Sequence, residues 1–156
     1  MIRPYASSRA PWGGVRFFAS PGSRPGLESI PVRAVLLIDD DADGRDAVAF
    51  VLEARGYRVA AAADGRSGIA LARESRPDVV VLDMSLPGLD GWETTRRLCA
   101  DPATRGAFII ALTGHATGEA RQRALDAGVD GYLVKPCAPE DVIAEIERLE
   151  AQGPRS

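Results

Sequence analysis

Four groups of polar residues, each directly after a short apolar run, define the chemistry available to this chain. In chain order, the groups are Asp39-Asp40-Asp41, Asp83, Thr113 and Lys135. If the four apolar runs are parallel strands of one sheet, these groups lie along its carboxyl edge, where open α/β sheets bind their ligands. Carboxylates, a hydroxyl and an ammonium brought together there suit a divalent cation and a phosphoryl group.

Lys135 is the only lysine of the chain, and the other 18 of its 19 basic residues are arginine. A background so biased toward arginine argues against an accidental lysine at this strand end. A compact ammonium on a flexible stem can follow a phosphoryl group that comes and goes, whereas a planar guanidinium cannot do so equivalently. We therefore expect Lys135 to contact an anionic group.

The apolar runs alternate with helical patterns from residue 32 onward. Strands are predicted over residues 32–38, 57–62, 78–82, 107–112 and 130–134. Helices are predicted over residues 43–55, 66–74, 91–100 and 117–127, and from Pro139 onward. Asp64 is expected to cap the second helix, while Gly56 and Gly128 end the first and the fourth. Five βα units predict a doubly wound, flavodoxin-like (βα)5 parallel sheet with strand order 2-1-3-4-5.

Composition places the chain among soluble globular proteins, with 46% hydrophobic and 26% charged residues. No apolar run approaches the ~20 residues needed to span a bilayer, so no membrane association is expected. Residues 1–33 carry five arginines and one glutamate, which leaves −7 on the remainder of a chain whose net charge is −3. An acidic domain argues against nucleic acid as the main partner. Cys99 and Cys137 lack disulfide or metal-site spacing, which predicts free thiols in a reducing cytosol.

The first residues differ from the rest, because proline, glycine and serine interrupt every periodic pattern. We predict a disordered N-terminal extension over residues 1–31, a globular domain over 32–152 and a short tail over 153–156. The extension is arginine-rich like an organelle transit peptide, although its prolines and glycines disrupt the amphipathic helix that such a peptide needs. A true start codon downstream of Met1 explains the composition equally well.

Four segments together resemble the receiver domain of bacterial response regulators. They are LLIDDD at 36–41, VVLDMSLPGLDG at 80–91, IIALTG at 109–114 and GYLVKP at 131–136. Each is weak alone, but all four in this order and spacing are highly specific. The resemblance covers the predicted globular domain. It implies a protein that catalyses its own phosphorylation and dephosphorylation rather than an enzyme acting on a separate substrate.

The resemblance also assigns roles to individual residues. It implies that Asp83 is the phosphoacceptor, and that Asp39 and Asp40 hold Mg²⁺ with the Asp83 carboxylate and the main-chain carbonyl of Ser85. Thr113 and Lys135 match the hydroxyl and ammonium that contact the phosphoryl group. The family further suggests a cis bond between Lys135 and Pro136. For Asp41, a helix cap or a solvated charge is an equally good interpretation.

Three positions are linked by the resemblance to switching and to phosphoryl lifetime. Tyr132 matches the aromatic switch position, where the ring turns inward when Thr113 moves toward the phosphoryl group. This would reshape the face built from residues 117–127, 130–134 and the last helix. Ser85 and His115 lie two positions beyond Asp83 and Thr113, where side chains border the attacking water. We hypothesise that they set the dephosphorylation rate, although His115 can also be an ordinary exposed loop residue.

Two other functions fit part of the pattern. A haloacid-dehalogenase-like phosphatase also uses a strand-end aspartate, a threonine, a lysine and Mg²⁺. It would take its nucleophile from Asp39-Asp40-Asp41 and would leave the segment 80–91 unexplained. A receiver-shaped adaptor that is never phosphorylated has no need for the intact set of site residues. We therefore expect a cytoplasmic phosphoacceptor.

The expected partners follow from the same interpretation. His115 is the only histidine, so the phosphodonor imidazole belongs to a histidine kinase or a histidine phosphotransfer protein. Few residues follow the last helix, so we expect a stand-alone, single-domain regulator with output through protein contact. The face that includes the last helix is the expected contact surface, and a homodimer formed there is possible.

Overall fold

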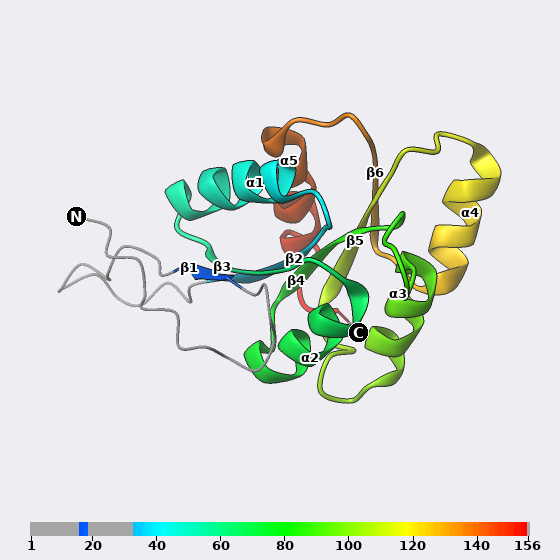
Figure 1. Ribbon diagram of the computed structural model, residues 1–156, viewed down its shortest axis with the longest axis horizontal. Helices are drawn as coiled ribbons and strands as arrows, with labels where there is room; N and C mark the ends of the chain where they lie inside the picture. Colours follow the sequence, from blue (N-terminus) through cyan, green and yellow to red (C-terminus); the bar gives the residue numbers. More distant parts are fainter. Residues whose placement is uncertain (1–15, 19–32, 156) are drawn as a thin grey trace, which may run out of the picture.

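The computed structural model describes residues 16–18 and 33–155, and its elements form one layered α/β domain (Figure 1). The strands are β1 (Arg16–Phe18), β2 (Ala34–Ile38), β3 (Arg58–Ala62), β4 (Val79–Asp83), β5 (Phe108–Thr113) and β6 (Gly131–Val134). The helices are α1 (Ala42–Ala54), α2 (Gly65–Ser75), α3 (Gly91–Ala100), α4 (Gly118–Ala127) and α5 (Pro139–Glu150). None of these helices is long and apolar enough to cross a bilayer.

The sheet has the order β1-β3-β2-β4-β5-β6. From β2 onward every pairing is parallel, so the five βα units have the predicted order 2-1-3-4-5. Figure 1 shows α1 and α5 covering one face of the sheet and α2 and α3 on the other. The doubly wound, flavodoxin-like fold is confirmed.

The central strands are apolar because helices cover both of their faces. All residues of β2, β4 and β5 are buried. Alternate side chains enter two separate clusters: Leu36, Val80 and Ile109 pack toward α2 and α3, whereas Val35, Val81 and Ile110 pack toward α1 and α5. A strand buried on both sides shows no polar alternation. The ladder is therefore held rigidly, which fixes the positions of the residues at its carboxyl ends.

The predicted helix boundaries agree with the structure to within one residue. The Asp64 side chain accepts a hydrogen bond from the Ser67 amide at 2.8 Å, which caps α2 as expected. Gly56 (φ 89°) and Gly128 (φ 107°) follow α1 and α4 in the left-handed region, which a residue without Cβ adopts at little cost. Pro139 occupies the first turn of α5.

Strand β1 was not expected from the sequence. It lies inside the segment 1–31 that we predicted to be disordered, so that prediction is wrong for Arg16–Phe18; the rest of the segment lies outside the described residues. β1 pairs antiparallel with β3, with Phe17 opposite Ala60. Three residues are too few to show a period of two, and this pairing partner lies about forty positions away in the sequence.

The C-terminal tail is fastened to the opposite edge of the sheet from the polar strand ends. The Arg155 guanidinium donates to the carbonyls of Arg105 (2.8 Å) and Gly128 (2.9 Å) and pairs with the Asp130 carboxylate at 3.1 Å. Asp130 in turn accepts the Ile109 amide at 2.8 Å. Arg155 thus links the end of α5 to the loops that precede β5 and β6.

Candidate functional site

Four neighbouring parallel strands carry the site residues to one edge. Asp39 follows β2, Asp83 ends β4, Thr113 ends β5 and Lys135 follows β6. The register of the ladder aligns three of these strand ends. Asp83 of β4 lies opposite Leu112 of β5, and Thr113 of β5 lies opposite Val134, the residue before Lys135. β4 and β5 extend one residue beyond our predicted ends, so Asp83 and Thr113 belong to the ladder itself. The structure therefore brings the predicted groups together at the carboxyl edge.

The carboxylates of Asp39, Asp40 and Asp83 form an acidic cluster, with one oxygen of each lying within 4.8 Å of the others. Asp39 and Asp83 are buried, at 8% and 4% exposure, whereas Asp40 is exposed. Asp41 is not part of this cluster. It is the N-cap residue of α1, but its side chain makes no capping hydrogen bond.

Lys135 bridges the two buried carboxylates. Its Nζ lies 3.1 Å from Asp39 Oδ2 and 3.2 Å from Asp83 Oδ2. Its main-chain amide donates to the Thr113 carbonyl at 2.7 Å, which ties the residue to the end of β5. The peptide bond between Lys135 and Pro136 is cis, as the resemblance suggested.

The same local arrangement orients both buried carboxylates. Asp39 Oδ1 accepts the amide of Asp41 at 2.9 Å, and Asp83 Oδ1 accepts the amide of Ser85 at 2.9 Å. In each case the amide two residues ahead holds one oxygen. The other oxygen, Oδ2, is left to face Lys135 and the cluster. Each aspartate thus orients its own side chain through its local turn.

Burial raises the pKa of the Asp39 carboxyl above its usual value, and the charge of Asp83 acts in the same direction. The hydrogen bond from Asp41 and the charge of Lys135 oppose this shift. A carboxyl whose pKa is higher in the folded chain stabilises the fold below its unfolded pKa, and that contribution is lost as the pH rises through the folded value. At neutral pH the ionised Asp39 therefore opposes folding, and a bound cation would offset part of that cost.

For Lys135, burial acts to lower the pKa, but the ion pairs with Asp39 and Asp83 outweigh it and raise the pKa above its usual value. The ammonium is therefore protonated throughout the neutral range. Three carboxylates against one ammonium leave a net negative site with hard oxygen ligands. This donor set fits Mg²⁺, which prefers carboxylate oxygen and retains several waters.

Thr113, Tyr132 and His115 form a second group beside the cluster. Thr113 is 2% exposed, and its hydroxyl accepts the His115 amide at 3.1 Å. The Tyr132 hydroxyl donates to the His115 carbonyl. Both side chains are thus tied to the loop between β5 and α4. The His115 and Ser85 side chains are exposed.

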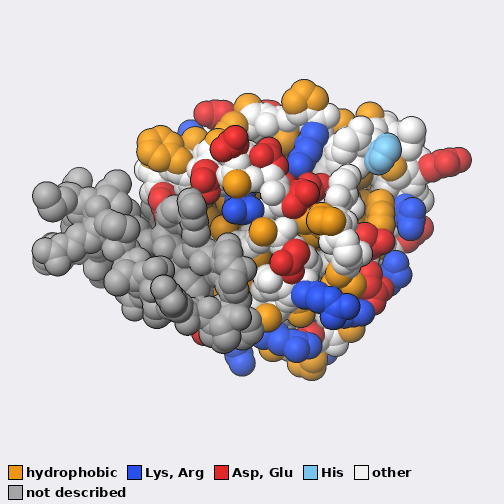
Figure 2. Space-filling view, in the orientation of Figure 1, with side chains coloured by type: hydrophobic (Ala, Val, Ile, Leu, Met, Phe, Trp, Pro, Cys, Tyr) orange, Lys and Arg blue, Asp and Glu red, His pale blue; other side chains and the backbone are white. Residues whose placement is uncertain are grey.

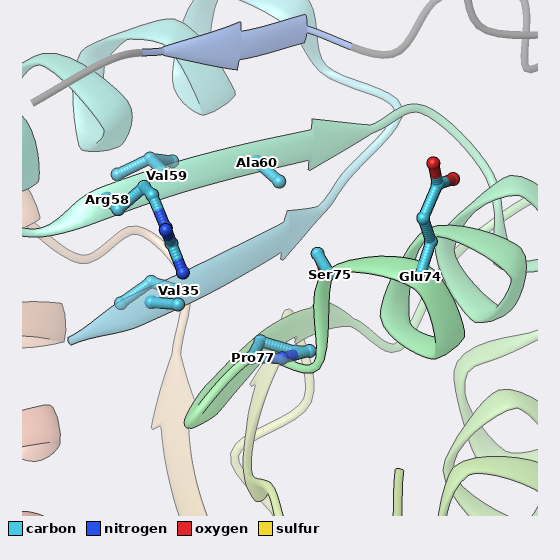
Figure 3. Close-up of a pocket in the computed structure, with 8 residues that line it drawn as sticks. Val35, Arg58, Val59, Ala60, Glu74, Ser75 and Pro77 are labelled. Atoms are coloured by element: carbon cyan, nitrogen blue, oxygen red, sulfur yellow. The ribbon is translucent and has the colours of Figure 1, made fainter. Parts of the chain in front are cut away.

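Two cavities in the described part of the chain lie outside the acidic cluster. One of about 340 Å³ flanks the site and is lined by His115, by the start of α4 and by Trp92, whose ring lies 4.6 Å from the Arg123 guanidinium carbon. The other, of about 360 Å³, lies at the amino ends of β2 and β3 (Figure 3). Its walls are mostly apolar, with Arg58 and Glu74 as charged members. It lies at the amino ends of the strands, whereas the site residues lie at their carboxyl ends.

Comparison with known protein families agrees with this geometry. Residues 35–147 match the model of the response regulator receiver domain. This chain belongs to the response regulator receiver family. Receiver domains accept phosphoryl groups from histidine kinases. The match includes the segment 80–91, which the phosphatase alternative left unexplained, and nothing in it indicates a haloacid-dehalogenase-like phosphatase.

The proteins to which this receiver is similar include regulators of several kinds. It is 35% identical over 117 residues to the phosphate regulon transcriptional regulatory protein PhoB of Escherichia coli, covering 75% of this chain and 51% of PhoB. The chain therefore spans about half the length of that regulator. The chemotaxis response regulator CheY4 of Vibrio cholerae has a TM-score of 0.73 and 32% identity, over 76% of this chain and 99% of that chain.

A third relative bears on the metal. The receiver domain of the sensor histidine kinase PA1611 from Pseudomonas aeruginosa PAO1 has a TM-score of 0.68 and 33% identity, over 76% of this chain and 97% of that chain. Its structure has a magnesium ion coordinated in the active site cleft. Receiver domains bind Mg²⁺ in their acidic site, and the present receiver has an aspartate cluster at its strand ends.

One residue of the site was missed by sequence reasoning. Arg45, in the first turn of α1, is buried and donates from Nη1 to the Asp39 carbonyl at 2.6 Å. Its position on the core-facing stripe, one turn before Ala49, is the only sequence signal. An arginine at such a position is normally assigned to the surface.

Proposed function

We propose that this chain is the phosphoacceptor of a two-component phosphorelay and that Asp83 receives the phosphoryl group. The observation that carries the proposal is the bridge from the single lysine, Lys135, to the two buried carboxylates of the acidic cluster. Family membership supports the reaction class, while the assignment of individual roles rests on this geometry.

The transfer step uses groups that already lie in place. Asp83 attacks phosphorus while the bond from phosphorus to the donor imidazole nitrogen breaks, and the bonding electrons leave with that nitrogen. Lys135, 3.2 Å from Asp83, neutralises charge on the phosphoryl oxygens. The Thr113 hydroxyl, at the next strand end, donates to one of these oxygens. The product is an aspartyl phosphate.

We assign Mg²⁺ to the cluster, with Asp39, Asp40, Asp83 and the main-chain carbonyl of Ser85 as protein ligands. When bound, the ion supplies positive charge that stabilises the phosphoryl oxygens during transfer. Asp39 and Asp83 suit this role because their carboxylates are buried and held by local turns.

The partner that donates the phosphoryl group is a histidine kinase or a histidine phosphotransfer protein, because the receiver family accepts phosphoryl groups from phosphohistidine. Cys99 and Cys137 are free, which fits a cytoplasmic location.

Nucleic acid is a less suitable partner, although PhoB is a transcriptional regulator. In Figure 2 basic side chains gather in the lower part of the visible face, near α2, while carboxylates are spread over that face.

Output passes through the face formed by α4, β6 and α5. Movement of Thr113 toward the phosphoryl group removes the hydroxyl that accepts the His115 amide, and inward rotation of Tyr132 breaks its bond to the His115 carbonyl. The loop before α4 is thereby released. Leu125 and Val134 are exposed on this face, at 45% and 37%, and offer apolar contacts to a protein target or to a second copy of the chain.

His115 and Ser85 are assigned to the lifetime of the aspartyl phosphate. His115 is exposed, and its main-chain amide donates to the Thr113 hydroxyl at the end of β5, so we place its side chain beside the path of the attacking water. Replacing it in His115→Ala is expected to speed decay by about threefold, equivalent to ~0.6 kcal/mol in barrier height. Phosphoryl loss from purified, phosphorylated protein is followed with time by intact mass. Gln122→Ala on α4 is the control, and decay curves identical to wild type would remove His115 from this role.

The proposed function is tested with acetyl phosphate as donor. The full chain is incubated with acetyl phosphate and MgCl₂, and its intact mass is measured with time. We expect the gain of one phosphoryl group, and a loss of nearly all incorporation when EDTA replaces the metal, because the acidic cluster then repels the incoming phosphate. A chain that stays unmodified with acetyl phosphate and with phosphohistidine donors at saturating Mg²⁺ would contradict the proposal.

A further inference from the structure

Arg45 is a buried cation next to the acidic cluster. Within residues 33–155 it is the only arginine or lysine that is buried, at 8% exposure. It shares the core-facing stripe of α1 with Ala49 and Leu52. Arginine seldom occupies such a position unless a specific partner compensates its charge.

The contacts of Arg45 point to the main chain rather than to a carboxylate. Nη1 donates to the carbonyl oxygen of Asp39 at 2.6 Å. Nε is buried and has no hydrogen-bond partner among the described groups. The ion pairs within 4.0 Å in the described part of the chain do not include Arg45. The residue therefore bonds to the backbone that carries the site, and no acid among residues 33–155 forms an ion pair with it.

With this contact, Asp39 is held at four points. Its amide donates to the Ala62 carbonyl at 3.1 Å, and its carbonyl accepts Arg45. Its two carboxylate oxygens accept the Asp41 amide and the Lys135 ammonium. β2 ends at Ile38, so the Asp39 carbonyl lies beyond the strand and Arg45 supplies its donor. The peptide group that contains this carbonyl also begins Asp40, the exposed member of the cluster.

Burying the guanidinium is costly unless the negative potential of the cluster offsets it. A neutral side chain could fill the same volume at lower cost. Arg45 therefore does more than fill space. Its hydrogen bond goes to the Asp39 carbonyl, and the orientation of that peptide group decides how the Asp39 and Asp40 carboxylates are placed.

We propose that Arg45 is a positioning residue for the acidic cluster. By holding the Asp39 carbonyl, it fixes the turn through Asp39 and Asp40 so that both carboxylates face Asp83, and it thereby sets the affinity of the cluster for a divalent cation. This inference rests on the proposed function, because the cation is the one assigned there.

A competing role for Arg45 predicts the opposite sign. If the guanidinium acted only as a counter-charge to the cluster, its removal would leave the site more negative and would tighten cation binding. If it positions Asp39 and Asp40, its removal loosens the ligands and weakens binding. The direction of the change in Mg²⁺ affinity therefore separates the two roles.

The experiment titrates MgCl₂ into the full chain and follows amide resonances by two-dimensional NMR. In Arg45→Met, which keeps an unbranched stem but loses charge and donor, we expect the Kd for Mg²⁺ to rise about tenfold. The Asp40 amide, part of the same peptide group as the Asp39 carbonyl, should shift even without metal. Arg45→Lys restores a cationic donor and should recover most of the affinity. Arg55→Met, at the exposed end of the same helix, is the matched control and should bind as wild type does.

A folded Arg45→Met that binds Mg²⁺ as tightly as wild type, or more tightly, overturns the inference. If Arg45→Met does not fold cooperatively, Arg45→Gln decides: a Kd raised about threefold or more supports positioning, and a wild-type or lower Kd overturns it. Failure of the proposed function looks different. In that case wild type and Arg55→Met also bind no Mg²⁺, or take up no phosphoryl group.

Discussion

The Asp83→Asn variant is expected to take up no phosphoryl group from acetyl phosphate under conditions that modify wild type fully. A side-chain amide is not a nucleophile toward phosphorus, and no second carboxylate occupies the same place. Asp39 is held by Lys135 and the Asp41 amide, while Asp40 lies outside the ladder. Because the cluster also loses one of three carboxylates, we expect the Kd for Mg²⁺ to rise about tenfold. Intact mass measures the first effect and an NMR titration the second.

Asp90→Asn is the matched control for this variant. Asp90 lies in the same segment and caps α3 by accepting the Glu93 amide at 2.9 Å, a role that asparagine fills equally well. It should therefore be phosphorylated at the wild-type rate. Incorporation into Asp83→Asn at a rate near that of wild type would show that another carboxylate is the acceptor.

The sequence sufficed for the ladder and for the residues at its ends. Strands such as Val79–Asp83 are continuous apolar runs, and each stops where polar groups begin, so their existence and their common edge follow from pattern alone. The right-handed crossover rule then leaves one natural strand order. What pattern could not give was which oxygen faces which donor, because that depends on turns such as the one that directs the Ser85 amide to Asp83.

The features that the sequence missed are all tertiary contacts with weak local signals. β1 is stabilised by pairing with β3, and its three residues carry no periodic pattern of their own. An arginine is normally assigned to the surface, and only the hydrogen bond to the Asp39 carbonyl, just beyond β2, explains why Arg45 is buried. Arg155 belongs to a short predicted tail, yet its guanidinium contacts the loops before β5 and β6. In each case a contact that no periodic pattern records outweighs the local propensity, whether its partner lies six residues away, as for Arg45, or farther along the chain.

Replacing Lys135 should separate metal binding from phosphoryl transfer. Lys135→Met keeps an apolar stem but removes the ammonium that lies 3.1 and 3.2 Å from Asp39 and Asp83. Loss of a positioned cation at the phosphoryl oxygens is expected to slow transfer by about 100-fold or more. Removal of the same charge leaves the cluster more negative, so Mg²⁺ should bind more tightly. A time course of intact mass at saturating Mg²⁺ measures the first effect, and an NMR titration with MgCl₂ measures the second.

Lys135→Arg supplies the comparison, because it keeps the charge but replaces the compact ammonium by a planar fork. The ammonium reaches two carboxylates from one point, which a guanidinium on a longer stem cannot reproduce without displacing one of them. We therefore expect a rate between those of wild type and Lys135→Met, with Mg²⁺ affinity close to wild type. Equal rates in Lys135→Met and wild type at saturating metal would mean that Lys135 is only the counter-charge of an acidic cluster. The opposite effects on transfer and on metal affinity are the signature of an ammonium that acts on the phosphoryl group itself.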